Sequence, residues 1–362
     1  MGSTSNNRQA EHADRPAPQI QYATASDGVK IAYCVIGDGP ALIHMSPMPF
    51  SHIQKEWTHS QSRNYYESLG SGLQLIRYDC RGAGLSDRNI SDYSPEAHAR
   101  DILAVAESQG LKRFALLGFG HSGPVAIQFA AQHPEFVSRL VLWCAYPRAA
   151  DYGRAPRVKA MRALVDEDWD FFTRAEGLQL SEYTGGATSN WFVEWVRESI
   201  TEEGYKAAVP ELRKMDVTAL MRQVQAPTLV LHRTGLTSIT VEMAKEIAAT
   251  IPSARLMLVE GTWISPYIGG GTKEIVAAIH NLVLETPAPA SQAGLVANPS
   301  VLTPRETEVL RLVANGRTSR EISDELSLSV RTVGRHITNI YAKIGARTRA
   351  DAATYAIRHR IA

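Results

Sequence analysis

The sequence has little that would tie the protein to a membrane, a disulfide framework or a metal centre. None of the apolar runs in its 362 residues approaches the roughly 20 residues needed to cross a bilayer. Residues 1–18 contain no apolar segment, which favours a disordered leader over a signal peptide. The three cysteines, Cys34, Cys80 and Cys144, lie in apolar segments without C-x-x-C spacing. We therefore expect buried, reduced thiols in a cytoplasmic protein without metal, cofactor or membrane contact.

Net charge is also small, at +1, but it is unevenly distributed along the chain. From Val301 onward the sequence carries eleven basic and six acidic side chains, a net charge of +5. The preceding residues therefore carry a net charge of −4. Such asymmetry favours a small nucleic-acid-binding module attached to a neutral or acidic body.

Composition and periodicity divide the chain into two domains. Residues 286–300 are rich in Pro, Ala and Ser, which indicates a linker between a body at 19–285 and a tail at 301–362. In the body, short apolar runs such as "LQLIRYDC", "FALLGF" and "PTLVLH" alternate with helical patterns. This alternation predicts an α/β fold with a parallel sheet covered on both faces. Residues 146–221 lose the strand rhythm and predict a helical lid.

The tail contains four helix starts. Capping boxes begin at Thr303 and Thr318, and Ser329 and Thr348 are suitable N-caps for two further helices. The short connection between the second and third helices is typical of a helix-turn-helix. In the third helix, an apolar stripe is expected from Val333, Ile337, Ile340 and Ile344.

The stretch from "LTPRE" through "SVRTVGRHITNIYAKIG" to "RTRADA" resembles the LuxR-type (GerE-like) DNA-binding domain. The resemblance implies a homodimer whose third helices enter the major groove of double-stranded DNA at two half-sites. Gly334 stands where many members carry Lys or another side chain that reaches DNA, so direct readout depends more on Arg331 and Arg335. RNA or a protein remains an alternative partner. The candidate DNA-binding residues are Arg320, Arg331, Thr332, Arg335, His336, Asn339, Lys343 and Arg347.

The body resembles the α/β-hydrolase family, on the motifs "RYDCRGAGLSDR" and "GFGHSGP" followed by "AAQHPEFVSRLVL". The resemblance implies a catalytic serine on a G-x-S-x-G turn after the fifth strand, followed along the chain by an acid and a histidine. Counting thirteen residues back from His133 and forward from the strand end "LLG" both place Gly120 at the serine position. The acid position is Leu236 and the histidine position is Ile264.

These replacements favour a binding cavity over a catalytic centre, because neither Gly, Leu nor Ile can transfer a proton. We expect a ligand-responsive transcriptional regulator with an inactive hydrolase-like body that binds a small, largely hydrophobic effector. A regulator with residual esterase or lactonase activity through Ser122 and a dimerisation scaffold without ligand remain alternatives. The candidate ligand-binding residues are Met48, Phe50, Gly120, His121, Trp169, Phe172, Trp191, Trp195, Leu236, Trp263 and Ile264.

Overall fold

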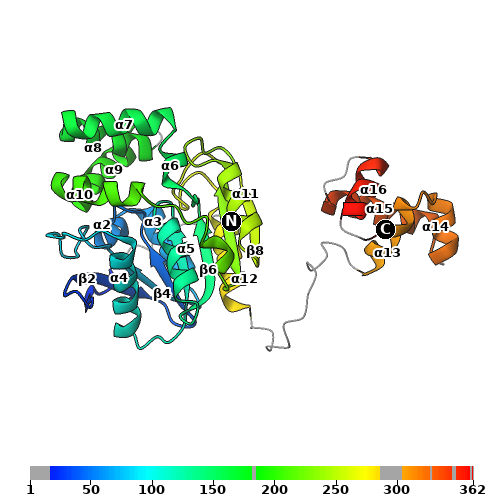
Figure 1. Ribbon diagram of the computed structural model, residues 1–362, viewed down its shortest axis with the longest axis horizontal. Coiled ribbons are helices and arrows are strands. Elements are labelled where there is room, and N and C mark those ends of the chain that lie inside the picture. Colours follow the sequence, from blue (N-terminus) through cyan, green and yellow to red (C-terminus); the bar gives the residue numbers. More distant parts are fainter. Residues whose placement is uncertain are drawn as a thin grey trace, which may run out of the picture. The chain divides into compact units, whose positions relative to one another are not determined.

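The computed structural model describes residues 17–181, 185–285, 304–326, 328–344, 348–358 and 361. The chain divides into two compact units, Met1–Thr286 and Pro287–Ala362 (Figure 1). The predicted linker and nearly all of the predicted leader lie outside the described residues.

The first unit is built on an eight-stranded sheet with the order β1-β2-β4-β3-β5-β6-β7-β8. The strands from β4 to β8 in this order are parallel, as expected, whereas β1 pairs with β2 and β2 with β4 in antiparallel fashion. The turn that includes Asp27 and Gly28 connects β1 to β2, and Gly28 adopts a φ of +88° that only glycine tolerates easily. The strands are β1 (Gln21–Thr24), β2 (Lys30–Ile36), β3 (Ala41–Met45), β4 (Gln74–Tyr78), β5 (Phe114–Phe119), β6 (Val137–Trp143), β7 (Thr228–Arg233) and β8 (Ala254–Val259).

Helices cover both faces of this sheet, because its central strands are apolar on both sides. All six residues of β5 are buried, and so are all six of β7. One face packs against α4 (Pro95–Ser108), α5 (Ser122–Gln132) and α11 (Val241–Thr250). The other packs against α2 (Ile53–Thr58), α3 (Ser60–Leu69) and α12 (Thr272–Leu284). The two apolar layers form the core of the unit.

A helical lid is inserted between β6 and β7. It consists of α6 (Ala149–Tyr152), α7 (Pro156–Glu167), α8 (Trp169–Leu180), α9 (Gly186–Ser199) and α10 (Glu202–Arg213). These green helices lie together beyond one end of the strands (Figure 1). The lid has an apolar cluster of its own, in which Phe172, Phe192 and Trp195 are almost completely buried.

The second unit is a small all-helical domain of α13 (Pro304–Ala314), α14 (Ser319–Leu326), α15 (Val330–Ile344) and α16 (Arg349–Arg358). The predicted capping box at Thr318 is confirmed, since Thr318 and Glu321 exchange hydrogen bonds between side chain and backbone. Ser329 Oγ accepts from the Thr332 N–H, and Thr348 Oγ1 accepts from the Asp351 N–H. Thr303 lies outside the described residues.

No helix in the described part of the chain is both long and apolar enough to cross a membrane. The three cysteines are buried and unpaired, as predicted. Within the same described ranges, His, Cys, Asp and Glu side chains form no group suited to holding a metal ion.

Candidate functional site

The turn between β5 and α5 has the geometry that presents a nucleophile in hydrolases, but its tip is glycine. Gly120 adopts a φ of +56°, a conformation that costs a residue with a side chain about 1–2 kcal/mol. Its N–H donates to the Trp143 carbonyl at 2.9 Å, and its carbonyl accepts from the Gly123 N–H at 3.0 Å. A Cβ at position 120 would lie 3.7 Å from Ile264 Cδ1. Position 120 therefore faces the loop after β8.

Ser122 lies underneath this turn. Its side chain is completely buried, and its Oγ accepts from the Phe119 N–H at 2.8 Å and donates to the Phe119 carbonyl at 3.0 Å. The hydroxyl therefore ties the start of α5 to the end of β5, through the kind of local bond to the backbone that serine side chains commonly make. It does not line the adjoining cavity.

A cavity of about 440 Å³ lies between the lid and the ends of the strands. This volume is within the range typical of small-molecule sites. Seven of the candidate ligand-binding residues line it, and the three triad positions are among them. The seven residues are Met48, Phe50, Gly120, His121, Trp195, Leu236 and Ile264.

The other four candidates lie outside the lining of this cavity. Trp169 stacks on Phe172, which is 1% exposed, so both belong to the apolar core of the lid. Trp191 packs against His59 and donates from Nε1 to Thr58. Trp263 packs over Gly269 within its own loop, where a Cβ would lie 2.5 Å from the indole ring. Trp169 and Phe172 thus belong to the core of the lid, Trp191 joins the lid to the segment between α2 and α3, and Trp263 packs within its own loop.

Several polar cavity residues were not anticipated from the sequence. Glu176, Gln179 and Arg157 line the lid side, and Thr237 and Ser238 follow β7. The helical period offers a signal for Glu176, because it lies four residues after the buried Phe172 on the same side of α8. Burial raises the pKa of Glu176 to about 7, with Arg157 opposing the shift.

His121 is the histidine closest to the turn, and its surroundings keep it neutral. Its Nδ1 lies 2.5 Å from the Tyr146 hydroxyl. Burial, with a further contribution from the positive charge of Arg162, lowers the pKa of His121 to about 4. No carboxylate is hydrogen-bonded to this ring in the described residues, so the acid–base relay of a hydrolase is not assembled around it.

Hydrogen bonds from buried side chains of the sheet hold the loop that carries Ile264. The fully buried Arg233 donates to the Glu260 carbonyl at 2.7 Å and to the Ile268 carbonyl at 2.9 Å. Trp143 Nε1 donates to the Ile264 carbonyl at 2.6 Å. These bonds fix the backbone at both ends and the middle of the loop, so that the Ile264 side chain closes the cavity floor.

In the second unit, α15 separates an apolar side from a polar side as predicted. Val333 and Ile340 are buried, whereas Arg335 and Asn339 are exposed and Thr332 and His336 are partly exposed. Arg320, on α14, is also exposed. The side chains of Arg331 and Lys343 on α15, and the whole of Arg347, lie outside the described residues.

Gly334 occupies open space on α15, since an added Cβ would have no neighbour within 4 Å. Replacing Gly334 with alanine is therefore expected to stabilise the second unit by about 0.5–1 kcal/mol. Thermal unfolding of the full chain should show a higher midpoint for the transition of this unit alone. A lower midpoint would contradict the expectation.

Two family models match the chain. The model "Bacterial regulatory proteins, luxR family" matches residues 300–356, and the model "alpha/beta hydrolase fold" matches residues 56–175. The chain joins an α/β-hydrolase-fold domain to a regulatory domain of the luxR family. The first unit is the hydrolase-fold domain, and the second is the luxR domain.

Relatives resemble one domain or the other. The transcriptional regulatory protein LiaR of Bacillus subtilis is 47% identical over 60 residues, which cover 17% of this chain and 28% of LiaR. Pyrrolizixenacetamide deacetylase of Xenorhabdus hominickii is 24% identical over 62% of this chain and 85% of its own. A Mycobacterium tuberculosis protein is 31% identical over 132 residues, so the chain spans about a third of the length of its mycobacterial relatives.

Solved structures match the hydrolase-fold domain. An esterase from Rhodococcus sp. aligns with a TM-score of 0.62 and 24% identity, covering 74% of this chain and 98% of the esterase. A bromoperoxidase from Bacillus anthracis aligns with a TM-score of 0.63 and 18% identity, covering 74% and 100%. At these identities the matches establish the fold, and the predicted fold class is thereby confirmed.

Proposed function

We propose that the protein is a ligand-responsive transcriptional regulator. Its hydrolase-fold domain binds a small, largely apolar effector without hydrolysing it, and its luxR domain binds promoter DNA as a homodimer. The observation that carries the proposal is that Gly120, Leu236 and Ile264 line one cavity at the positions where the resemblance to hydrolases implies a serine, an acid and a histidine. The cavity is therefore present, but residues that cannot act as nucleophile, acid or base occupy the three positions.

The cavity is suited to recognition because its lining combines apolar side chains with a few polar groups. Met48, Leu236 and Ile264 supply hydrocarbon surface, and the Gly120 turn and the Thr237–Ser238 segment add polar groups. Ligand sites in proteins commonly combine mostly apolar walls with a few polar groups that orient the ligand. One relative of this domain is named pyrrolizixenacetamide deacetylase, and a name that denotes action on a small organic molecule supports an effector of that size.

Hydrolysis of generic esters is expected to be absent. The purified full chain should not hydrolyse p-nitrophenyl butyrate above the rate in buffer, and Ser122→Ala should leave this result unchanged. The physical reason is that Ser122 Oγ is buried and bonded to the Phe119 backbone. Turnover that disappears in Ser122→Ala would establish the alternative, a regulator that retains esterase activity.

Effector binding is tested independently by ligand-dependent stabilisation. A thermal-shift screen of apolar lactones, phenolics and terpenoids should raise the unfolding midpoint of the hydrolase-fold domain, because a ligand that binds only the folded state stabilises it. A screen in which no compound raises the midpoint would favour a dimerisation scaffold without ligand.

DNA binding rests on the luxR domain and on the polar side of α15. Arginine and asparagine side chains provide the donors and acceptors that read base edges in the major groove. We further propose that the effector changes the population of dimer arrangements that place two α15 helices at the spacing of the half-sites. Effector binding and DNA binding would then be thermodynamically coupled, each changing the affinity for the other by the same factor.

A further inference from the structure

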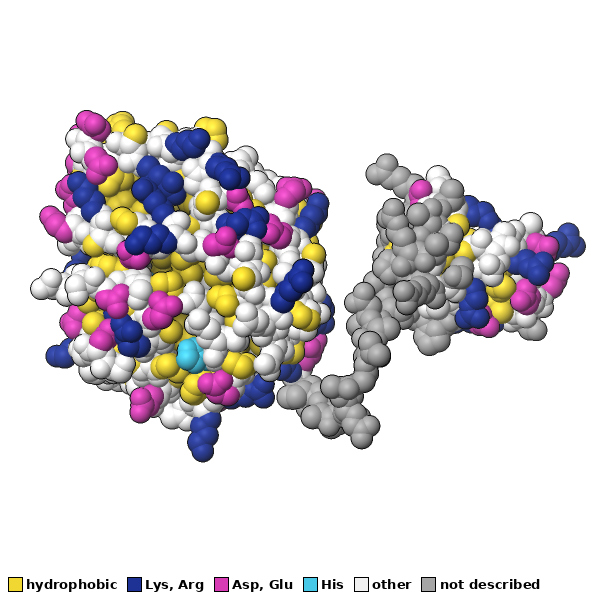
Figure 2. Space-filling view, in the orientation of Figure 1, with side chains coloured by type: hydrophobic (Ala, Val, Ile, Leu, Met, Phe, Trp, Pro, Cys, Tyr) yellow, Lys and Arg dark blue, Asp and Glu magenta, His cyan; other side chains and the backbone are white. Residues whose placement is uncertain are grey.

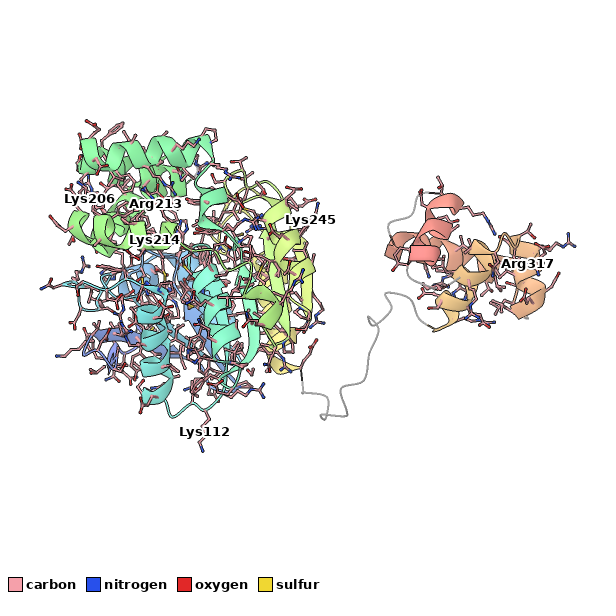
Figure 3. The ribbon with its side chains drawn as sticks, viewed as in Figure 1. Lys112, Lys206, Arg213, Lys214, Lys245 and Arg317 are labelled. Carbon is pink, nitrogen blue, oxygen red and sulfur yellow. The ribbon has the colours of Figure 1, made fainter. Side chains whose placement is uncertain are left out.

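The cavity has a polar side lobe under the lid. This lobe, about 60 Å³ in volume, is lined by Arg162 from α7 and Arg213, the last residue of α10 (labelled in Figure 3). Phe50, His121, Tyr152, Glu176 and Gln179 line both the lobe and the main cavity, so the two spaces adjoin. A molecule that occupies the main cavity can therefore extend one end into the lobe.

The arginines at the lobe differ from four others in and next to the lid. Arg148, Arg154, Arg174 and Arg197 each form an ion pair with an aspartate or glutamate. Arg162 and Arg213, by contrast, form no ion pair or hydrogen bond with any described residue. Among the described residues, the lid therefore leaves three arginines without an ion pair: the exposed Arg157 at the main cavity, and the partly exposed Arg162 and the exposed Arg213 at the lobe.

These two arginines lie close enough to repel each other. Burial, and then the positive charge of Arg213, lower the pKa of Arg162. Arg213 is exposed and Arg162 partly exposed, so solvent screens part of this repulsion, and an anion bound between the two guanidinium groups would offset the remainder. The face of the molecule shown in Figure 2 has several basic side chains over the lid, which also attract an anion towards this part of the domain.

Glu176 is the one acidic side chain among the lining residues of the lobe, and its charge at neutral pH is incomplete. Burial raises its pKa to about 7, although Arg157 opposes the shift. The charged and titratable groups around it are Arg157 and Arg162 from α7, Tyr152 from α6, Tyr205 and Arg213 from α10, and His121 before α5. In its protonated form Glu176 donates a hydrogen bond to an anion instead of repelling it.

We infer that the effector is an amphipathic carboxylic acid, whose carboxylate is held by Arg162 and Arg213 in the side lobe. This inference rests on the proposed function and specifies the chemical class of its ligand. The guanidinium forks offer paired N–H donors that match the two oxygens of a carboxylate. The hydrocarbon part of the molecule lies in the main cavity, against Phe50, Trp195, Leu236 and Ile264.

The inference is tested with three probes that share one hydrocarbon chain and differ in the polar group. Decanoate, decanamide and decylamine are titrated into the full chain below their micellar concentrations, with binding followed by calorimetry at pH 7. Decanoate is expected to bind at least about tenfold more tightly than decanamide, because charge-assisted hydrogen bonds exceed neutral ones. Decylamine is expected to bind most weakly.

The variants Arg162→Met and Arg213→Met are expected to remove the preference for decanoate while leaving the affinity for decanamide within about twofold. Arg174→Met is the matched control, because Arg174 lies on the lid but pairs with Asp170. That variant should retain the preference. If Arg162→Met impairs folding, Arg162→Lys, which keeps the charge but not the fork, should show an intermediate preference in a folded protein.

The pH dependence of the affinity for decanoate gives an independent test of the role of Glu176. Between pH 6 and pH 8.5 the affinity for decanoate is expected to fall by about tenfold as Glu176 ionises, and Glu176→Gln should make the affinity nearly independent of pH. Decanamide should show no such dependence in the native protein.

The possible failures are distinguishable. Equal affinity for decanoate and decanamide, or preferred binding of decylamine, would overturn the carboxylate inference while leaving the apolar effector cavity in place. Absence of binding by all three probes would count against this inference and against the proposed effector site together.

Discussion

A double variant of α15, Arg331→Ala with Arg335→Ala, is expected to lose about 30-fold to 20,000-fold in affinity for its specific DNA site. Each lost base contact costs about 1–3 kcal/mol, so two contacts cost about 2–6 kcal/mol. Arg335 is exposed on the polar side of the helix, opposite the buried Val333 and Ile340.

The measurement starts from DNA sites that the native full chain selects from a random-sequence pool. Fluorescence anisotropy then compares native and variant proteins on a selected site and on a scrambled one, at a fixed salt concentration. Arg311→Ala is the matched control, because Arg311 is an exposed arginine of the same domain that belongs to α13 instead of α15. It should weaken both sites slightly and equally. Unchanged specific affinity in the double variant would contradict the assignment of α15 as the recognition helix.

Replacing Arg77 with methionine is expected to destabilise the hydrolase-fold domain by about 3–5 kcal/mol. Arg77 is completely buried on β4, and its guanidinium pairs with Glu56, which is 2% exposed. The Tyr66 hydroxyl donates to the same carboxylate at 2.8 Å, and the guanidinium stacks 3.3 Å from the centre of the Tyr66 ring. Removing the arginine leaves a buried carboxylate without its counter-ion, which costs far more than the net contribution of the pair.

Urea unfolding of the full chain, followed by tryptophan fluorescence, measures this change in the transition of the hydrolase-fold domain. The control is Lys55→Met, since Lys55 pairs with the exposed Glu194 and Glu198. Such surface pairs contribute less than about 1 kcal/mol. A double variant, Glu56→Leu with Arg77→Met, should recover part of the loss because neither charge is then buried. A loss below 1 kcal/mol in Arg77→Met would show that water reaches Glu56.

The strands and the starts of the helices could be predicted from the sequence, because the residue patterns that indicate them are local. Alternating apolar runs located the strands, and capping residues such as Thr318 and Ser329 located helix starts. Counting along the strand and helix around the β5 turn also identified Gly120. The antiparallel edge formed by β1 and β2 was indicated only by the Asp27-Gly28 turn.

The cavity wall was harder to predict, because a long side chain can be buried in several directions from one helix. Trp169 and Trp191 have the spacing of cavity residues, but they pack against Phe172 and His59. The position of each is decided by contacts between helices that are distant in sequence. The unpaired state of Arg162 depends on where carboxylates from other helices lie, and no pattern within α7 records that.

The positive φ of Gly120 also bears on how the hydrolase-fold domain can change during evolution. In a glycine this conformation is nearly free of strain, so the chain keeps the sharp turn without the cost of about 1–2 kcal/mol that a side chain imposes there. A mutation to serine would impose that cost at once, whereas catalysis would require the replacement of Leu236 and Ile264 as well. On the proposed function, in which the domain binds its ligand without hydrolysing it, this single substitution is destabilising and confers no activity, which favours retention of the glycine.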